Sequence, residues 1–344
     1  MTSSRTGDPE TSIQQPGPAV IETRGLTKVF TLRTRAGALR RHRRDVEAVN
    51  DIDLVVRAGE MVGYIGPNGA GKSTTIKMLT GVLAPSNGSV RVLGLEPVRQ
   101  RIALARRIGV VFGQRSQLWW DLPLADSFAL LRTVYRIDAA THRRNLDAFI
   151  DRLDLGPLLD TPVRQLSLGQ RMRGELAAAL LHDPELVFLD EPTVGLDVVS
   201  KHEVRRFLGE LNREQGTTVL LTTHDLSDIE HLCRRMVIID NGTVAYDGPL
   251  DDFRSRYGTH RTIVVDLQEE GPPLDVAGTD VVDVVGARQW LRFDRRLTSA
   301  SQVVTAIVAQ RAIRDLAIEE PDIEDMVRRL YDGTAHAETG PQAP

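Results

Sequence analysis

The chain carries the stretch Gly66-Pro67-Asn68-Gly69-Ala70-Gly71-Lys72-Ser73-Thr74 between an apolar run, Met61 to Ile65, and a helical pattern, Thr75 to Leu79. This is GxxxxGK[ST] in the strand-loop-helix setting that a phosphate-binding loop requires. Its glycines allow backbone angles that turn successive N–H groups toward one anion, and the helix N-terminus adds partial positive charge. We therefore expect these residues to bind a nucleoside triphosphate, with Lys72 at the β- and γ-phosphates and the Ser73 hydroxyl on magnesium.

Two acids follow a second apolar run. Leu186 to Leu189 leads directly into Asp190-Glu191-Pro192. Ligands bind at the carboxyl ends of the strands in a parallel sheet. We therefore expect Asp190 to hold magnesium, and Glu191 to polarise the attacking water as a general base, a role worth ~10²–10⁴ in rate. An isolated acidic pair would more often be a solvated turn, but the phosphate-binding loop upstream favours the catalytic interpretation.

Short apolar runs alternate with helical patterns over most of the chain. Such runs are typical of parallel strands buried on both faces. The pattern predicts an α/β fold whose central sheet includes Met61 to Ile65, Ile108 to Phe112, Leu186 to Leu189, Thr218 to Leu221 and Met236 to Ile239.

The pattern changes after Gly258. We expect a small separate α+β domain at 258–344, ending in a disordered tail from about 334. Its predicted strands are Thr262 to Leu267, Val281 to Val285, Gln289 to Phe293 and Asp315 to Glu319, and its predicted helices are Thr298 to Gln310 and Ile323 to Tyr331. At the other end, residues 1–19 offer few apolar groups and are expected to be a disordered leader.

Composition limits the class of protein. The formal net charge of -4 over 344 residues gives no overall bias toward nucleic acid, so no nucleic-acid partner is expected. No stretch approaches the ~20 apolar residues that a membrane-spanning helix needs. The polar N-terminus is unlike a secretory signal, and Cys233, the only cysteine, excludes an intrachain disulfide. A cytoplasmic protein is therefore expected.

The segment Leu166-Ser167-Leu168-Gly169-Gln170 resembles the signature motif of ATP-binding cassette (ABC) proteins. Ser167 and the Gly169 N–H begin a helical pattern, Arg171 to Leu181, which makes a second anion-binding helix N-terminus. Alone, this segment would suit a plain N-capped helix. Its position ahead of the Asp190 strand favours the family.

Further residues match the family in order along the chain. Gln114 resembles the glutamine that senses magnesium and water, Asp197 the loop that touches the opposite subunit, and His224 the γ-phosphate-sensing histidine. Taken singly, each is more typical of a structural residue, but as an ordered set they support one assignment. Phe30 is placed like the aromatic residue that stacks on adenine, and a buried core phenylalanine is the alternative.

The resemblance covers about Ile21 to Asp252 and implies an ABC-type P-loop ATPase domain at 20–257. Such a domain has a mostly parallel core sheet, an antiparallel β subdomain and a helical subdomain, here about 115–175. Family members form head-to-tail dimers, with each ATP lying between the phosphate-binding loop of one subunit and the signature segment of the other. The implied cofactors are ATP and Mg²⁺.

The resemblance also implies an integral-membrane permease, contacted near Gln114–Pro123, with the chain peripheral on the inner face of the cell membrane. Trp119 and Trp120 lie there and suit a binding anchor, with a subdomain core as the alternative. An Arg-rich insertion at about 33–45 is expected to be a solvated loop, or less often a contact with lipid or permease. The pattern is most similar to ATPase subunits of bacterial type 2 exporters, and the rival is an ABC ATPase that acts on nucleic acid or ribosomes.

Overall fold

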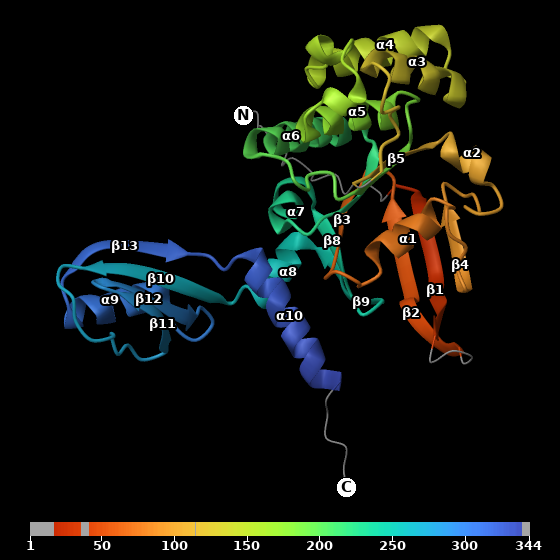
Figure 1. The fold of residues 1–344 in the computed structure, drawn as a ribbon. Helices are drawn as coiled ribbons and strands as arrows, with labels where there is room; N and C mark the ends of the chain where they lie inside the picture. Colours follow the sequence, from red (N-terminus) through yellow and green to blue (C-terminus); the bar gives the residue numbers. More distant parts are fainter. Residues whose placement is uncertain (1–16, 36–40, 114, 339–344) are drawn as a thin grey trace, which may run out of the picture.

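The computed structural model describes residues 17–35, 41–113 and 115–338 (Figure 1). A six-stranded sheet forms the centre. Five strands, β5, β6, β7, β3 and β8, lie side by side in that order and run parallel. The sixth, β9, lies at the edge of the sheet and pairs antiparallel with β8. The predicted parallel strands are thus confirmed. The strand order is β5 (Ile108–Phe112), β6 (Leu186–Asp190), β7 (Thr218–Thr222), β3 (Met61–Ile65), β8 (Arg235–Asp240) and β9 (Thr243–Pro249).

A second, antiparallel sheet lies beside the first. It has the order β2 (Arg41–Arg57), β1 (Ala19–Arg35) and β4 (Asn87–Val92). The ladder of β1 and β2 continues outward to the pairs Arg33 with Arg43 and Arg35 with Arg41. The described part of the Arg-rich insertion is therefore strand and not the expected loop, because the pairing begun in the buried part of the hairpin extends into it.

Helices cover both faces of the central sheet and supply two hydrophobic cores. The face toward the antiparallel sheet packs with α1, and the opposite face packs with α3 to α8. In Figure 1, α3, α4 and α5 gather at one end as a helical subdomain. The helices are α1 (Lys72–Leu79), α2 (Arg101–Ala105), α3 (Leu124–Tyr135), α4 (Ala139–Arg152), α5 (Leu168–Leu180), α6 (Val198–Gln215), α7 (Leu226–Leu232) and α8 (Leu250–Tyr257), with short 3₁₀ turns at Gly156–Leu158 and Val163–Gln165.

The C-terminal region builds its own antiparallel sheet and core. The sheet order is β11 (Thr279–Val285), β12 (Arg288–Asp294), β10 (His260–Leu267) and β13 (Ile313–Glu319), and α9 (Ala300–Gln310) packs on it. All the strands and helices predicted there are present.

The last helix, α10 (Ile323–Glu338), leaves this sheet and runs back along α8 (Figure 1). It buries Ile323, Met326, Val327 and Leu330 in the core of the first domain. The helix also passes residue 334, where the predicted tail begins. Within the described residues, every helix is too short or too polar to cross a bilayer.

Candidate functional site

A cleft of about 730 Å³ opens where β3, β5, β6 and β7 end. Predicted site residues from three separate parts of the chain meet there: Asn68, Gly69, Gly71, Lys72, Ser73, Thr74, Asp190, Glu191 and His224. Other lining residues were not anticipated by sequence: Ala48, Lys77, Val82, Phe112, Gly113, Arg115 and Val194. The cleft therefore collects a phosphate-binding loop, two acids and an imidazole on one sheet edge.

The phosphate-binding loop depends on Gly71. Its φ of 103° lies in the left-handed region, and a Cβ there would come within 2.3 Å of the Ala48 carbonyl oxygen. Lys72 begins α1 with only 7% of its surface exposed. Its Nζ donates to the carbonyl oxygens of Gly66 at 2.6 Å and Pro67 at 3.1 Å. Burial lowers the pKa of this ammonium, while the nearby Glu191 and Asp190 carboxylates act in the opposite direction.

Asp190 ends β6 beside the start of α1. Its Oδ1 accepts a hydrogen bond from the Thr222 hydroxyl at 2.6 Å and lies 3.4 Å from Ser73 Oγ. The two oxygen ligands predicted for magnesium are therefore neighbours. Thr222 was missed by sequence reasoning, although a hydroxyl at the carboxyl end of a buried strand is the signal that marks it.

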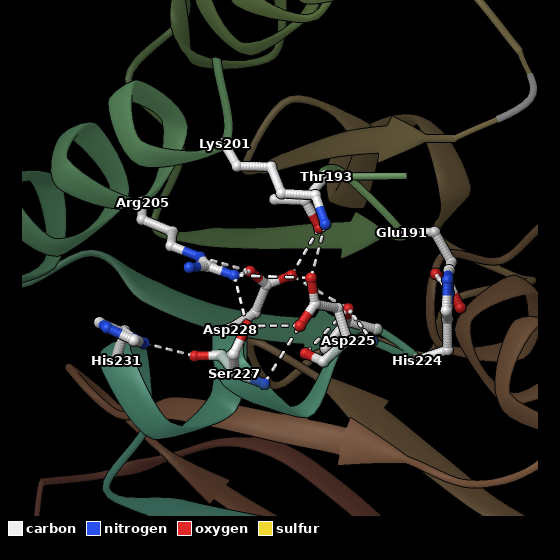
Figure 2. Close-up of polar contacts among 10 residues, drawn as sticks. Glu191, Thr193, Lys201, Arg205, His224, Asp225, Ser227, Asp228 and His231 are labelled. Carbon is white, nitrogen blue, oxygen red and sulfur yellow. Dashed lines mark hydrogen bonds and ion pairs between the residues drawn. The ribbon is translucent and has the colours of Figure 1, made fainter. Parts of the chain in front are cut away.

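Glu191 and His224 both line the cleft, and their side chains contact each other (Figure 2). His224 Nδ1 lies 2.5 Å from Glu191 Oε2. Glu191 has a φ of 58°, a conformation uncommon outside glycine that occurs often at active sites. Its backbone N–H donates to the Thr222 carbonyl at 3.0 Å, which holds this turn to the end of β7.

The signature segment forms a second helix N-terminus. Ser167 caps α5: its hydroxyl accepts from the Gln170 N–H, and the Gln170 side chain accepts from the Ser167 N–H. A Cβ on Gly169 would come within 2.3 Å of Ser200 Oγ, so this segment packs on the start of α6, which Asp197 caps. Among the described residues, those lining the cleft do not include Ser167, Gly169, Gln170 or Asp197.

The remaining predicted residues have different outcomes. Gln114 lies outside the described residues. Phe30 is 37% exposed on β1, so it is not the buried core residue considered as an alternative, and it is not among the lining residues of the cleft. The Lys28 ammonium lies 5.3 Å from the centre of the Phe30 ring. Trp119 and Trp120 are 39% and 52% exposed, which excludes the core alternative for both.

Comparison with known proteins fits this geometry. The family model described as "ABC transporter" matches residues 49–194. The daunorubicin resistance ATP-binding protein DrrA3 of Streptomyces coeruleorubidus is 35% identical over 288 residues, which cover 81% of this chain and 87% of that protein. The chain belongs to the ABC transporter family. The ABC transporter ATP-binding protein NatA of Bacillus subtilis (strain 168) is 33% identical over 60% of this chain and 84% of its own length.

Solved structures resemble this ABC subunit in fold. One solved structure, of the ATP binding subunit of an ABC transporter, matches with a TM-score of 0.59 and 29% identity, covering 70% of this chain and 93% of that one. The ATP-binding cassette MJ0796, described as dimeric, post-hydrolysis and bound to ADP and Pi, matches with a TM-score of 0.58 and 25% identity over 67% and 98% of the two chains. This chain is accordingly a P-loop ATPase of the ABC type.

Proposed function

We propose that two copies of this chain associate head-to-tail, so that the signature segment of each completes the cleft of the other. The observation that carries the proposal is the separation of two anion-binding helix ends within one chain. Lys72 at the start of α1 lines the cleft, whereas Ser167 at the start of α5 lies on an exposed surface. MJ0796, which is similar in fold, is dimeric, and this supports the association of two copies.

Within each cleft the residues would divide the work of hydrolysis. The loop N–H groups and Lys72 bind the phosphates of ATP. Glu191 takes up the proton of the attacking water as general base. His224 lies against Glu191. In this proposal it contacts the γ-phosphate, and the pair orients the water and the transferred phosphoryl group together.

Magnesium fits the oxygen ligands that the chain offers. Ser73 and Asp190 supply a hydroxyl and a carboxylate next to each other, and Mg²⁺ commonly combines one or two protein oxygens with substrate phosphates and water. When bound, the ion would neutralise charge on the phosphate oxygens. Gln114 is proposed as a further contact to it.

The transport role is proposed from the relatives. Besides DrrA3, the Nod factor export ATP-binding protein I of Cupriavidus pinatubonensis is 36% identical over 70% of this chain. We place this chain in the same class: an ATPase that drives export through a separate permease at the inner face of the membrane. These names favour transport over action on nucleic acid or ribosomes. Direct evidence would come from purifying the chain together with an integral-membrane subunit whose presence raises its ATPase rate.

The dimer can be tested with a hydrolysis-deficient chain. Glu191→Gln is expected to bind ATP, to hydrolyse it at least ~100-fold more slowly, and to sediment as a dimer in the presence of ATP. Adding Ser167→Arg should abolish the ATP-dependent dimer.

A matched control is available at Ser299, which caps α9 with the same reciprocal hydrogen bonds as Ser167. Ser299→Arg removes a similar N-cap, which typically lowers the free energy of unfolding by ~1 kcal/mol. It should nevertheless leave the dimer intact. Near-normal turnover in Glu191→Gln would remove Glu191 from its role. An ATP-dependent dimer that tolerates Ser167→Arg would refute the head-to-tail arrangement.

A further inference from the structure

A fully buried carboxylate lies behind the cleft. Asp228, on α7, has no exposed surface. Arg205 Nε donates to its Oδ1 at 2.6 Å, while the hydroxyls of Thr193 and Thr223 donate to its Oδ2 at 2.5 Å and 3.0 Å (Figure 2). Both oxygens are thus bound by side chains from outside α7.

The three donors come from segments that carry the site. Thr193 lies two residues after Glu191, and Thr223 immediately precedes His224. Arg205 lies on α6, the helix that Asp197 caps. None of the four residues in this cluster is among those lining the cleft, so any effect of the cluster on the chemistry must pass through its neighbours.

The two hydroxyls meet at a single oxygen of Asp228 and complete the hydrogen bonds that its burial requires. An ionised carboxylate is costly to bury unless it is paired and hydrogen-bonded, and Arg205 already supplies the opposite charge. Next to it, Lys201 pairs with Asp225 at 2.6 Å and adds a second link between α6 and α7. Thr193 lies outside both helices, so its bond to Asp228 also ties the turn that follows Glu191 to α7.

We propose that Asp228 is a positioning residue, which holds the Thr193 and Thr223 segments at a fixed separation and thereby sets Glu191 and His224 against each other. The proposal rests on the proposed roles of those two residues in hydrolysis. It predicts that the bonds to Asp228 act on the chemical step, and that ATP binding, which depends on the loop before α1, is nearly independent of them.

The Thr193 hydroxyl allows the sharpest test. Thr193→Val keeps the volume of the side chain and leaves the Arg205–Asp228 pair in place. Steady-state hydrolysis should show kcat lower by about tenfold, the size expected from losing one hydrogen bond to a charged group. The KM for ATP should stay near that of the wild-type chain, and the melting temperature should fall only slightly, as expected for one lost buried hydrogen bond. Thr193→Ser, which keeps the hydroxyl, should restore kcat to within about twofold.

Thr23 supplies a matched control. Its side chain is 2% exposed, and its hydroxyl donates to the Ile52 carbonyl oxygen at 2.8 Å in the antiparallel sheet. Thr23→Val removes a comparable buried hydrogen bond and should leave kcat unchanged. If Thr193→Val does not fold, Thr223→Val and Thr223→Ser test the second hydroxyl on Asp228 Oδ2, where valine also removes the acceptor of the Asp225 N–H.

Three outcomes would overturn the proposal: kcat kept within about twofold in the valine variant, no rescue by serine, or an equal loss of kcat in Thr23→Val. Glu191→Gln and His224→Ala separate this failure from that of the proposed function. Wild-type turnover in those two variants would overturn the roles of Glu191 and His224 themselves. Loss of turnover there, with Thr193→Val unaffected, would overturn only the assignment of Asp228.

Discussion

Asp225 shows how one carboxylate can serve both a helix and a catalytic turn. It follows His224, caps α7 by accepting from the Ser227 N–H, and pairs with Lys201 at 2.6 Å. Partial burial acts to raise the pKa of Asp225. Hydrogen bonds from Lys201 and Ser227 lower it by more than that, so that the pKa falls from the usual 3.8 to about 2. Folding therefore favours the ionised form of this residue.

The consequence is a defined loss of stability in acid. Because the folded-state pKa lies below the unfolded one, the contribution of Asp225 is fully present above a pH of about 4 and disappears as the pH falls through about 2. Its size is at most about 2 kcal/mol. Chemical denaturation of the wild-type chain and Asp225→Asn should give free energies of unfolding that differ near neutral pH and converge as the pH falls below about 2. A difference that persists unchanged into this acid range would contradict the assignment.

For single residues, the sequence predicted those that belong to a local motif and missed those whose role depends on contacts between distant parts of the chain. Lys72, Asp190 and Glu191 follow from local motifs, because each stands at the end of a recognisable strand or the start of a helix. Asp228 gives no such signal: its partner Thr193 is 35 residues away along the chain. Only the pairing of the strands brings these two together.

The segment before α3 exposes two tryptophan side chains, Trp119 and Trp120. It carries Trp120, over whose ring the Arg171 guanidinium of α5 lies at 5.7 Å. Phe112, Arg115, Trp120, Arg171 and Glu175 line a smaller hollow of about 250 Å³. Glu175 is 4% exposed and accepts from the Gln117 N–H at 3.0 Å, which ties this segment to α5. Burial raises the pKa of this carboxyl, against the effect of its hydrogen bonds.

A tryptophan exposed on a supported segment is a suitable binding anchor. Trp120→Ala is expected to leave the ATPase rate of the purified chain unchanged, and to lower the fraction of the chain that co-sediments with membranes of cells producing it. Trp290, in the C-terminal sheet, provides the comparison, because Trp290→Ala removes the same side chain from another domain. Equal membrane fractions in both variants and the wild-type chain would contradict the anchor.

Helices and strands were predictable where their burial gives a recognisable pattern of apolar residues in the sequence. β3 and β5 have the predicted ends because each is a short apolar run between polar turns. The outer part of β1 and β2 was missed since its arginines carry no alternation of apolar and polar residues. In this part of the hairpin, contacts between the two strands hold the backbone in the strand conformation. One example is the Thr31 hydroxyl, which donates a hydrogen bond across the strands to Asp45 at 2.6 Å.

For the whole molecule, the position of α10 joins two regions that sequence treats as separate. The C-terminal sheet and α9 enclose one core, whereas α10 buries its apolar face in the core shared by α7 and α8. The sequence predicted the helix but not its destination, because an amphipathic pattern shows that a face is buried and not against what. Since α7 also carries Asp228, the end of the chain packs on the helix that supports His224.

A substitution at Leu330 can test, in the full-length chain, whether the packing of α10 stabilises the first domain. Leu330 is 6% exposed within the core of the first domain, so Leu330→Ala should leave a cavity and cost about 2–5 kcal/mol. ATP identifies the unfolding transition of that domain, because a ligand that binds only the folded state raises its melting temperature. The ATP-sensitive transition should move to lower temperature in Leu330→Ala and stay in place in Val308→Ala, which alters a side chain on α9 that is 59% exposed. If only an ATP-insensitive transition moves, α10 stabilises the C-terminal sheet alone, and its packing on α7 contributes nothing to the catalytic domain.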